Sequence, residues 1–286
     1  MNLIDYIKIR SIILEALKED IGSADITSES TIDNFAMAEA NFLAKEDGIF
    51  AGEKVLESIF HLFHPEASVE ILEKDGNEIK KGTILAKAYG KAKLLLQIER
   101  TALNFIQRMS GIATLTNQFV KKISHTKAQI LDTRKTCPGL RFLDKMAVKI
   151  GGGKNHRFGL YDMILIKDNH IEAARGIKPA VQKARNYLAA NNLSHIKIEV
   201  ECANLQMVQE ALDSKCDIIM LDNFSIDEMK KAVKLINGIV PVEASGNVNL
   251  NTVAEIAETG VNYISVGALT HSVKALDISM KIKLKK

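Results

Sequence analysis

The sequence of 286 residues contains no tryptophan, four prolines and three cysteines. The three cysteines, Cys137, Cys202 and Cys216, are widely spaced, which excludes both a disulfide framework and a Cys-x-x-Cys metal site. The chain also lacks an apolar run of 18 residues, a low-complexity tract and a polybasic tail, so we expect no membrane span. Acids and bases interrupt the apolar positions of the first 20 residues, which predicts an amphipathic helix rather than a signal peptide. We therefore expect a cytoplasmic protein in a reducing compartment.

Basic charge is concentrated in one segment, residues 132–171. This segment has eight basic and four acidic side chains, whereas the whole chain has a net charge of only +3. A local excess of this kind, with a glycine triplet at Gly151–Gly153, favours a pocket for a small and densely anionic ligand. Nucleic acid is not expected, because there is no spread-out basic face and no interleaving of aromatic and basic residues.

The chain has an apolar fraction of 47% and a charged fraction of 26%, as soluble globular proteins do, so we expect a substantial core. Its first part mixes helix and strand, with strands at Ala36–Ala44 and Ser68–Leu72 and a helix at Leu94–Val120 that Gly111 could divide. From Gln129 onward, short apolar runs alternate with helical segments such as Ala173–Asn191, which predicts parallel strands in a barrel or a doubly wound sheet. The runs are 130–131, 163–166, 196–200, 218–221, 240–244 and 263–266.

Each of these runs leads into a polar residue or a glycine. These residues are Asp132 with Arg134, Lys167, Glu201, Asp222, Ser245 and Gly267. The carboxyl ends of the strands form the active-site face of β/α barrels, so we expect these residues to share one site. We leave Glu199 out as a primary ligand, on the expectation that its side chain faces away from that of Glu201.

An ordered set of motifs resembles the quinolinate phosphoribosyltransferase family over nearly the whole chain. The motifs are EDIGSADIT (19–27), ERTALN (99–104), DTRKTCPGLR (132–141), GGGKNHR (151–157), LIKDNHI (165–171), EVE (199–201), LDNF (221–224), EASGN (243–247) and SVGALTHS (265–272). The resemblance implies an N-terminal α/β sandwich domain (1–115) and an incomplete parallel β/α barrel of six or seven strands (116–270). It also implies a C-terminal helix (271–286) that packs back towards the N-terminal domain.

The resemblance also implies a reaction. The enzyme would join quinolinate to phosphoribosyl pyrophosphate (PRPP), giving nicotinate mononucleotide, pyrophosphate and carbon dioxide in de novo NAD synthesis. A homodimer is expected, with Arg100 completing the site of the neighbouring subunit, and a higher oligomer is compatible with it. Arg100 could instead be a solvated helix residue.

By resemblance, six residues bind quinolinate: Arg100, Thr133, Arg134, His156, Arg157 and Lys167. Arginine suits this role because its planar fork donates two parallel hydrogen bonds to a carboxylate. His156 could alternatively be a buried structural histidine. Lys135 is a point charge suited to pyrophosphate, and we expect it to be catalytic together with Glu201 and Asp222.

Glu201 and Asp222 need a reason to lie in a cationic site. They could hold Mg²⁺, directly or through water, or accept hydrogen bonds from the ribose hydroxyls of PRPP. Either acid could instead pair with a neighbouring lysine or arginine. The PRPP phosphates are expected at Lys135, Glu201 and Asp222 and at the two small-residue turns Ser245, Gly246, Asn247 and Val266, Gly267, Ala268.

Other basic residues and the cysteines have weaker assignments. Arg141 and Lys154 are as compatible with the surface as with pyrophosphate, Lys145 and Lys149 are expected on the surface, and Cys137 and Cys202 have no expected role. Two rival interpretations stay open. One is a related phosphoribosyltransferase-like protein of the ModD type, associated with molybdate transport genes, and the other is a non-catalytic sugar-phosphate-binding barrel.

Overall fold

The computed structural model describes residues 3–285 and divides the chain into two compact units. Unit 1 comprises Met1–Asn117, Thr136–Gly152 and Thr270–Lys286, and unit 2 comprises Gln118–Lys135 and Gly153–Leu269. The chain therefore passes from one unit to the other several times. No helix among residues 3–285 is long and apolar enough to cross a membrane.

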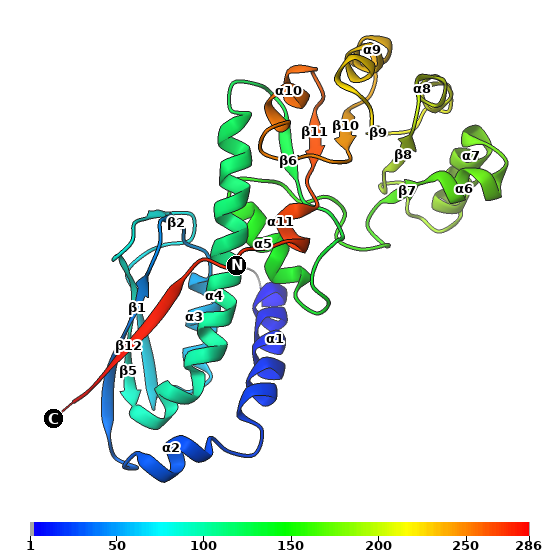
Figure 1. Cartoon of the computed structure of the whole chain (residues 1–286). Coiled ribbons are helices and arrows are strands. Elements are labelled where there is room, and N and C mark those ends of the chain that lie inside the picture. The colour runs from blue at the N-terminus through cyan, green and yellow to red at the C-terminus, as the bar shows by residue number, and fades with distance from the viewer. Residues whose placement is uncertain (1–2, 286) are drawn as a thin grey trace. The chain divides into compact units, whose positions relative to one another are not determined.

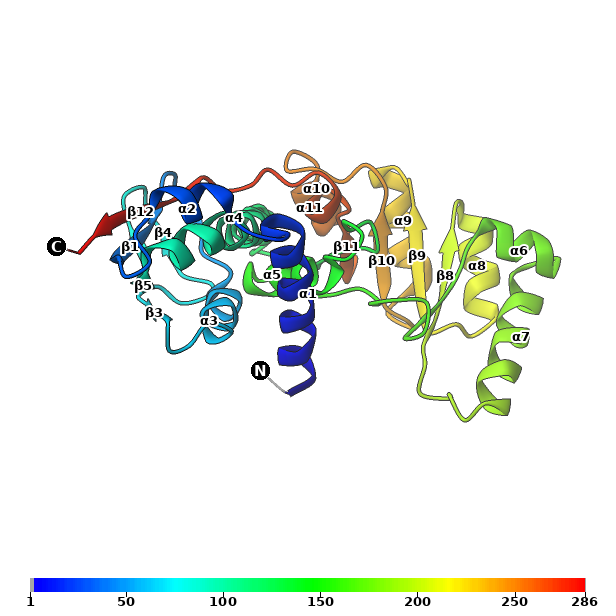
Figure 2. The same cartoon turned by 90° about the horizontal axis from the view of Figure 1, so that it is seen from below.

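Unit 1 contains an antiparallel sheet in the order β12-β1-β5-β3 (Figure 2). The strands are β1 (Met37–Ala44), β3 (Ala67–Ile71), β5 (Ile84–Lys91) and β12 (Ile278–Leu284). In β1, Ala38, Ala40, Phe42 and Ala44 are buried and alternate with more accessible residues, as expected for a sheet with one face on a core. A short pair, β2 (Gly48–Ile49) with β4 (Glu78–Ile79), lies outside this sheet.

Residues 278–284 form a strand, so the predicted helix over 271–286 is wrong within the described residues, and residue 286 lies outside them. Residues 278–284 read ISMKIKL, in which apolar and polar residues alternate, and alternation of this kind matches the two-residue period of a strand. β12 pairs with β1 from Ala38 opposite Leu284 to Ala44 opposite Ile278. A helical segment would have scattered these apolar residues around its circumference.

The helices of unit 1 are α1 (Leu3–Ile21), α2 (Ile26–Thr31), α3 (Glu53–His61), α5 (Arg141–Ile150) and most of α4 (Ala92–Lys122). The N-terminal helix is confirmed, and it buries Ile9, Ile13 and Leu17 at helical spacing. Gly111 does not divide α4. A Cβ there would lie 2.2 Å from the carbonyl oxygen of Lys274, so glycine allows close packing rather than ending the helix.

Unit 2 contains a parallel sheet whose strands follow the order β6-β11-β10-β9-β8-β7 across Figure 1. The strands are β6 (Gln129–Leu131), β7 (Ile164–Ile166), β8 (Ile198–Cys202), β9 (Ile218–Asp222), β10 (Val242–Ser245) and β11 (Tyr263–Ser265). Each sequence-predicted apolar run is one of them. Within residues 3–285, β6 and β7 are edge strands that do not pair with each other. The incomplete barrel, expected with six or seven strands, is therefore confirmed and has six.

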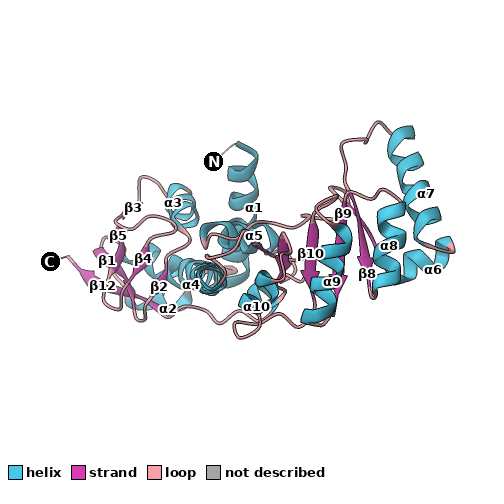
Figure 3. Ribbon diagram, turned by 90° about the horizontal axis from the view of Figure 1, so that it is seen from above, coloured by secondary structure: helices cyan, strands magenta, loops and turns pink. Residues whose placement is uncertain are grey.

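The helices of unit 2 follow the strands, as Figure 3 shows for α8 and α9 beside β8 to β10. They are α6 (Asp168–Ala174), α7 (Ile177–Ala190), α8 (Leu205–Asp213), α9 (Ile226–Ile236), α10 (Val253–Glu258) and the first half of α11 (Ala268–His271). The single helix predicted at Ala173–Asn191 is two, because Arg175 and Gly176 adopt positive φ angles of 66° and 129°.

Candidate active site

The carboxyl ends of the parallel strands bring the predicted residues of unit 2 to one edge of the sheet. Ile166 pairs with Val200, so Lys167 and Glu201 follow side by side, and Ser245 pairs directly with Asp222. β6 lies beside β11, which places the Asp132–Lys135 segment next to the residues that follow Ser265. A shared edge of this kind is the active-site face of β/α barrels.

Asp132 organises the basic part of this edge. Its carboxylate is fully buried and accepts hydrogen bonds from the His156 backbone N–H (2.9 Å) and the Asn155 side chain (2.5 Å). The backbone N–H of Asp132 donates to the carbonyl oxygen of Lys154, and Leu131 forms an isolated parallel β-bridge with Lys154. Asp132 therefore ties the loop after Gly153 to the end of β6, next to Thr133 and Arg134.

Arg157 and Arg134 are half-buried and close enough to repel each other. Burial, followed by the charge of Arg134, lowers the pKa of Arg157, while Glu199 and Asp162 oppose that change. The Arg157 guanidinium donates to the carbonyl oxygen of Met163 at 3.2 Å. Two guanidinium groups held together in partial burial form a site that an anionic carboxylate would stabilise.

Lys167 and Glu201 form an ion pair of 2.6 Å between Nζ and Oε2. The Lys167 side chain is 44% exposed and that of Glu201 is 17% exposed, so the pair lies at the mouth of the barrel with a face open to solvent. This contact agrees with the alternative that Glu201 pairs with a neighbouring lysine. A carboxylate has two oxygens, so this pair leaves Glu201 able to accept further hydrogen bonds.

Asn223 links two of the predicted phosphate-site segments. Its side chain donates to Asp222 at 2.8 Å and accepts from the Asn247 side chain at 3.2 Å, and its backbone N–H donates to Ser245. Gly246 has a φ of 99°, and a Cβ there would lie 2.1 Å from the Asn223 side-chain oxygen. Only glycine fits this turn. Asn223 is not among the predicted site residues, although it belongs to the LDNF motif.

Glu199 and Glu243 are buried beneath this edge, with exposed fractions of 0% and 1%. Burial raises the pKa of Glu199 to about 7, and burial together with the charge of Glu199 raises that of Glu243 to about 8. The expectation that Glu199 faces away from Glu201 is wrong, because side chains two residues apart on a strand share a face. The same period of two, counted back from Ser245, would have found Glu243.

Most of the remaining basic candidates belong to unit 1 and not to the strand ends of unit 2. Arg100 belongs to unit 1, where it is exposed on α4. The Arg141 Nε donates to the Thr136 hydroxyl at 3.0 Å within unit 1. Lys154 is exposed, as is Lys149, whereas Lys145 is 1% exposed and the prediction of a surface position for it is wrong. Lys145 and Val148 are three residues apart on α5 and share a buried face, which charge alone did not indicate.

The three cysteines are free thiols. Cys137 is exposed, and Cys202 and Cys216 are buried. Burial raises the pKa of Cys216 to about 12 and raises that of Cys202 further. Thiols that stay protonated at neutral pH are poor nucleophiles, so a catalytic role for Cys202 and Cys216 finds no support.

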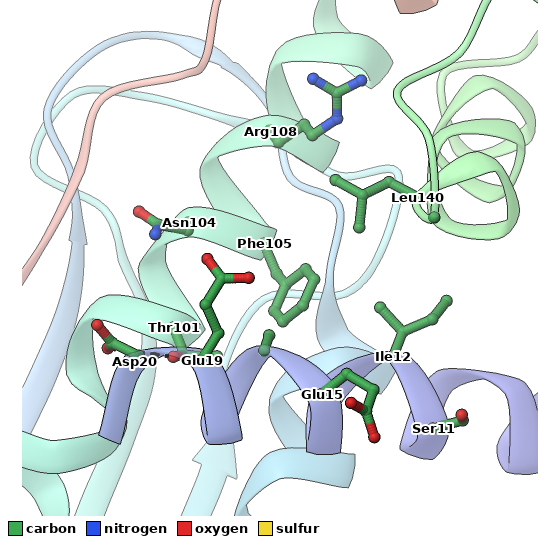
Figure 4. A pocket seen from close by; sticks show the side chains of 12 residues that line it. Ser11, Ile12, Glu15, Glu19, Asp20, Thr101, Asn104, Phe105, Arg108 and Leu140 are labelled. Carbon is green, nitrogen blue, oxygen red and sulfur yellow. Dashed lines mark hydrogen bonds between the residues drawn. The ribbon is translucent and has the colours of Figure 1, made fainter. Parts of the chain in front are cut away.

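Unit 1 holds a separate pocket of about 550 Å³ between α1 and α4 (Figure 4). Its polar lining includes Glu15, Glu19, Asp20 and Arg108, and its apolar lining includes Ile12 and Phe105. The Arg108 guanidinium is paired with Asp144, so the three carboxylates of the lining would repel a dianionic or polyphosphate substrate. The pocket is therefore unsuited to the anionic ligand that the sequence predicts.

Comparison with known proteins matches both parts of the chain to one family. Residues 25–110 match the N-terminal domain and residues 112–281 the C-terminal domain of quinolinate phosphoribosyl transferase. A tobacco (Nicotiana tabacum) mitochondrial quinolinate phosphoribosyltransferase [decarboxylating] is 50% identical over 93% of this chain and 80% of its own length. A probable nicotinate-nucleotide pyrophosphorylase [carboxylating] from Bacillus subtilis is 43% identical over 98% of this chain and 95% of its own.

Solved structures are similar over nearly the full length. NadC from Streptococcus pyogenes aligns with a TM-score of 0.92 and 38% identity, over 98% of each chain. A nicotinate-nucleotide pyrophosphorylase from Ehrlichia chaffeensis aligns with a TM-score of 0.90 and 44% identity, over 96% of this chain and 98% of its own.

Proposed function

The chain belongs to the quinolinate phosphoribosyltransferase family, and we propose that the carboxyl edge of the unit 2 sheet is where it joins quinolinate to PRPP. The enzyme transfers the phosphoribosyl group to the pyridine nitrogen with loss of carbon dioxide, and so forms nicotinate mononucleotide and pyrophosphate. The observation that carries the assignment of the site is the series of polar residues at consecutive strand ends. Basic side chains and carboxylates lie together at this edge, as the pair of Lys167 and Glu201 shows.

Arg134, Arg157 and Lys167 are the proposed ligands of the two quinolinate carboxylates, with Thr133 and His156 beside them. The half-buried guanidinium groups support this role, because a carboxylate would relieve their mutual repulsion. When quinolinate binds, Lys167 would exchange part of its contact with Glu201 for the substrate. Glu201 would then be available to PRPP.

Lys135, Glu201 and Asp222 are the proposed catalytic residues and contact PRPP. Lys135 is exposed next to the end of β6 and would receive the departing pyrophosphate as a point charge. The two turns Ser245, Gly246, Asn247 and Val266, Gly267, Ala268 are the proposed phosphate sites. The contacts of Asn223 support this assignment, because they pre-organise the first turn before any ligand binds.

Glu201 and Asp222 fit a magnesium ion, because both offer carboxylate oxygens at neighbouring strand ends and both are only partly buried. We propose that they hold it directly or through water. When bound, Mg²⁺ would neutralise charge on the pyrophosphate. The carboxylates themselves would stabilise the positive charge that develops at the ribose anomeric carbon.

The proposed mechanism needs no protein nucleophile. The pyridine nitrogen attacks the anomeric carbon of ribose as the bond to pyrophosphate breaks. The pyridinium that forms is an electron sink, so the bond to the 2-carboxylate breaks and carbon dioxide leaves. The ring carbon that keeps the electron pair then takes up a proton from solvent, which completes nicotinate mononucleotide. The arginines orient the ring in both steps, and Lys135 stabilises the leaving pyrophosphate.

Nicotinate mononucleotide formation and carbon dioxide release, measured for the purified protein with quinolinate and PRPP, test this function. Nicotinate in place of quinolinate is the comparison, because a ModD-type protein need not require the dicarboxylate. PRPP binding without product formation would instead support a non-catalytic barrel. Free thiols at all three cysteines support a cytoplasmic location, which fractionation of the source cells would check.

A homodimer is part of the proposal, with Arg100 of each subunit completing the neighbouring site. The exposure of Arg100 on α4 is compatible with this role. Mixing inactive Arg100→Ala and Asp222→Ala proteins tests it. Random exchange of subunits should restore about a quarter of the wild-type activity, because half of the dimers then contain one intact site. No recovery after verified exchange would show that Arg100 does not act across subunits.

A further inference from the structure

His156 is held at both nitrogens of its ring. Nδ1 accepts a hydrogen bond of 2.7 Å from the backbone N–H of Arg157. Nε2 lies 3.1 Å from Oε2 of Glu199 and 3.5 Å from Oε2 of Glu243. The His156 side chain is 8% exposed, so solvent has little access to these contacts.

These contacts fix the tautomer of His156. A backbone N–H can only donate, so Nδ1 must carry a lone pair, and the proton of the neutral ring must be on Nε2. The protonated Nε2 therefore faces the acid pair, within ion-pair distance of both carboxylates. The three side chains also have the composition of a metal site, with ligand atoms within 4.8 Å of one another. However, a protonated Nε2 has no lone pair for a cation, so the geometry favours a direct contact between the ring and the acid pair over a metal site.

The acid pair itself comes from the interior of the barrel. Glu199 lies on β8 and Glu243 on β10, each two residues before a strand-end residue of the active site. The buried Ser265 hydroxyl, on β11, donates to Oε1 of Glu243. The anchor for His156 thus rests on three strands of the sheet rather than on a loop.

We propose that Glu199 and Glu243 are positioning residues for quinolinate binding, which they support by anchoring the His156 ring that in turn holds the backbone of Arg157. His156 then contributes through Arg157 rather than through a ring nitrogen of its own. Glu199 has a second effect, because its charge opposes the repulsion between Arg157 and Arg134. This inference rests on the proposed function and adds two residues to it.

Glu243→Gln tests the proposal, because it keeps the size of the side chain and alters the contact with His156. The KM for quinolinate should rise about tenfold, the range seen when supporting hydrogen bonds of a binding group are lost, while the KM for PRPP stays within about twofold. Glu199→Gln should raise the quinolinate KM at least as much. Glu258→Gln, the same change at an exposed acid that contacts His125, is the matched control.

A double variant separates positioning from general structural damage. In a His156→Ala background, Glu243→Gln should have little further effect on the quinolinate KM, because the residue through which it acts is gone. If Glu243→Gln does not fold, Ser265→Ala removes only the hydroxyl behind Glu243 and should give a smaller rise of the same kind.

Three results would overturn the proposal. The first is that Glu243→Gln raises the KM for quinolinate and the KM for PRPP equally. The second is that Glu243→Gln raises the quinolinate KM as much in the His156→Ala background as in the wild-type protein. The third is that the purified wild-type protein holds a stoichiometric metal ion and the Glu243→Gln variant does not. Failure of the wild-type protein to form nicotinate mononucleotide would refute the proposed function and this inference together. Wild-type turnover with an unchanged quinolinate KM in Glu243→Gln would refute the positioning role alone.

Discussion

Replacing Arg108 by methionine should destabilise unit 1 far more than removing a surface ion pair of the same length. Arg108 Nε and Nη2 each donate at 2.8 Å to the two carboxylate oxygens of Asp144, and Nη2 also donates to the Thr270 carbonyl oxygen at 3.2 Å. Asp144 is completely buried, while the Arg108 side chain is 25% exposed. The Arg108→Met variant therefore leaves a buried carboxylate without its charge partner.

Breaking a buried pair costs about 3–5 kcal/mol, and the partial exposure of Arg108 places this case at about 3 kcal/mol. A loss of that size lowers the midpoint of thermal unfolding by roughly 6–12 °C in a protein of this size. Lys18 and Glu15 give the matched control, because their ion pair is also 2.8 Å long but the two side chains are 70% and 71% exposed. Lys18→Met should cost no more than about 0.5 kcal/mol.

Differential scanning calorimetry of the two variants and the wild-type protein measures both effects under the same conditions. A double-mutant cycle with Asp144→Asn isolates the coupling between Arg108 and Asp144 from the loss of packing. If Arg108→Met shifts the unfolding midpoint no more than Lys18→Met does, burial of Asp144 does not set the strength of the pair, and the reasoning is wrong.

Three further predictions concern catalysis. Lys135→Ala should lower kcat/KM about 100-fold, because it removes the charge that receives pyrophosphate. Lys149→Ala, at an exposed position on α5, is the control and should leave the steady-state kinetics unchanged. Near-normal turnover of Lys135→Ala would contradict the role of Lys135. Gly246→Ala should raise the KM for PRPP about tenfold and leave the KM for quinolinate within about twofold, because the new Cβ would meet Asn223. Equal rises in the two KM values would contradict the assignment of this turn as a phosphate site. Asp222→Asn should raise the Mg²⁺ concentration for half-maximal rate about tenfold, as a magnesium titration would show, and an unchanged dependence would exclude it as a ligand.

Local sequence patterns predicted most of the fold. The apolar runs became the strands of unit 2, since a strand buried on both faces needs consecutive apolar residues. The pattern also located the polar residues that follow those strands, such as Lys167 and Asp222. The C-terminal helix was expected from the family resemblance and not from a local pattern. The residues themselves alternate like a strand, and pairing with β1 fixes that conformation.

The sequence by itself determined which residues stand at the strand ends, because a residue's position along a strand is a local property. Only the tertiary structure decided which of them meet, since that depends on the order of strands in the sheet. Glu199 and Glu243 lie 44 positions apart in the chain, yet both lie within 3.5 Å of the His156 ring. Burial is equally non-local. Lys145 and Lys149 are on the same helix, and only packing around α5 buries the first and exposes the second.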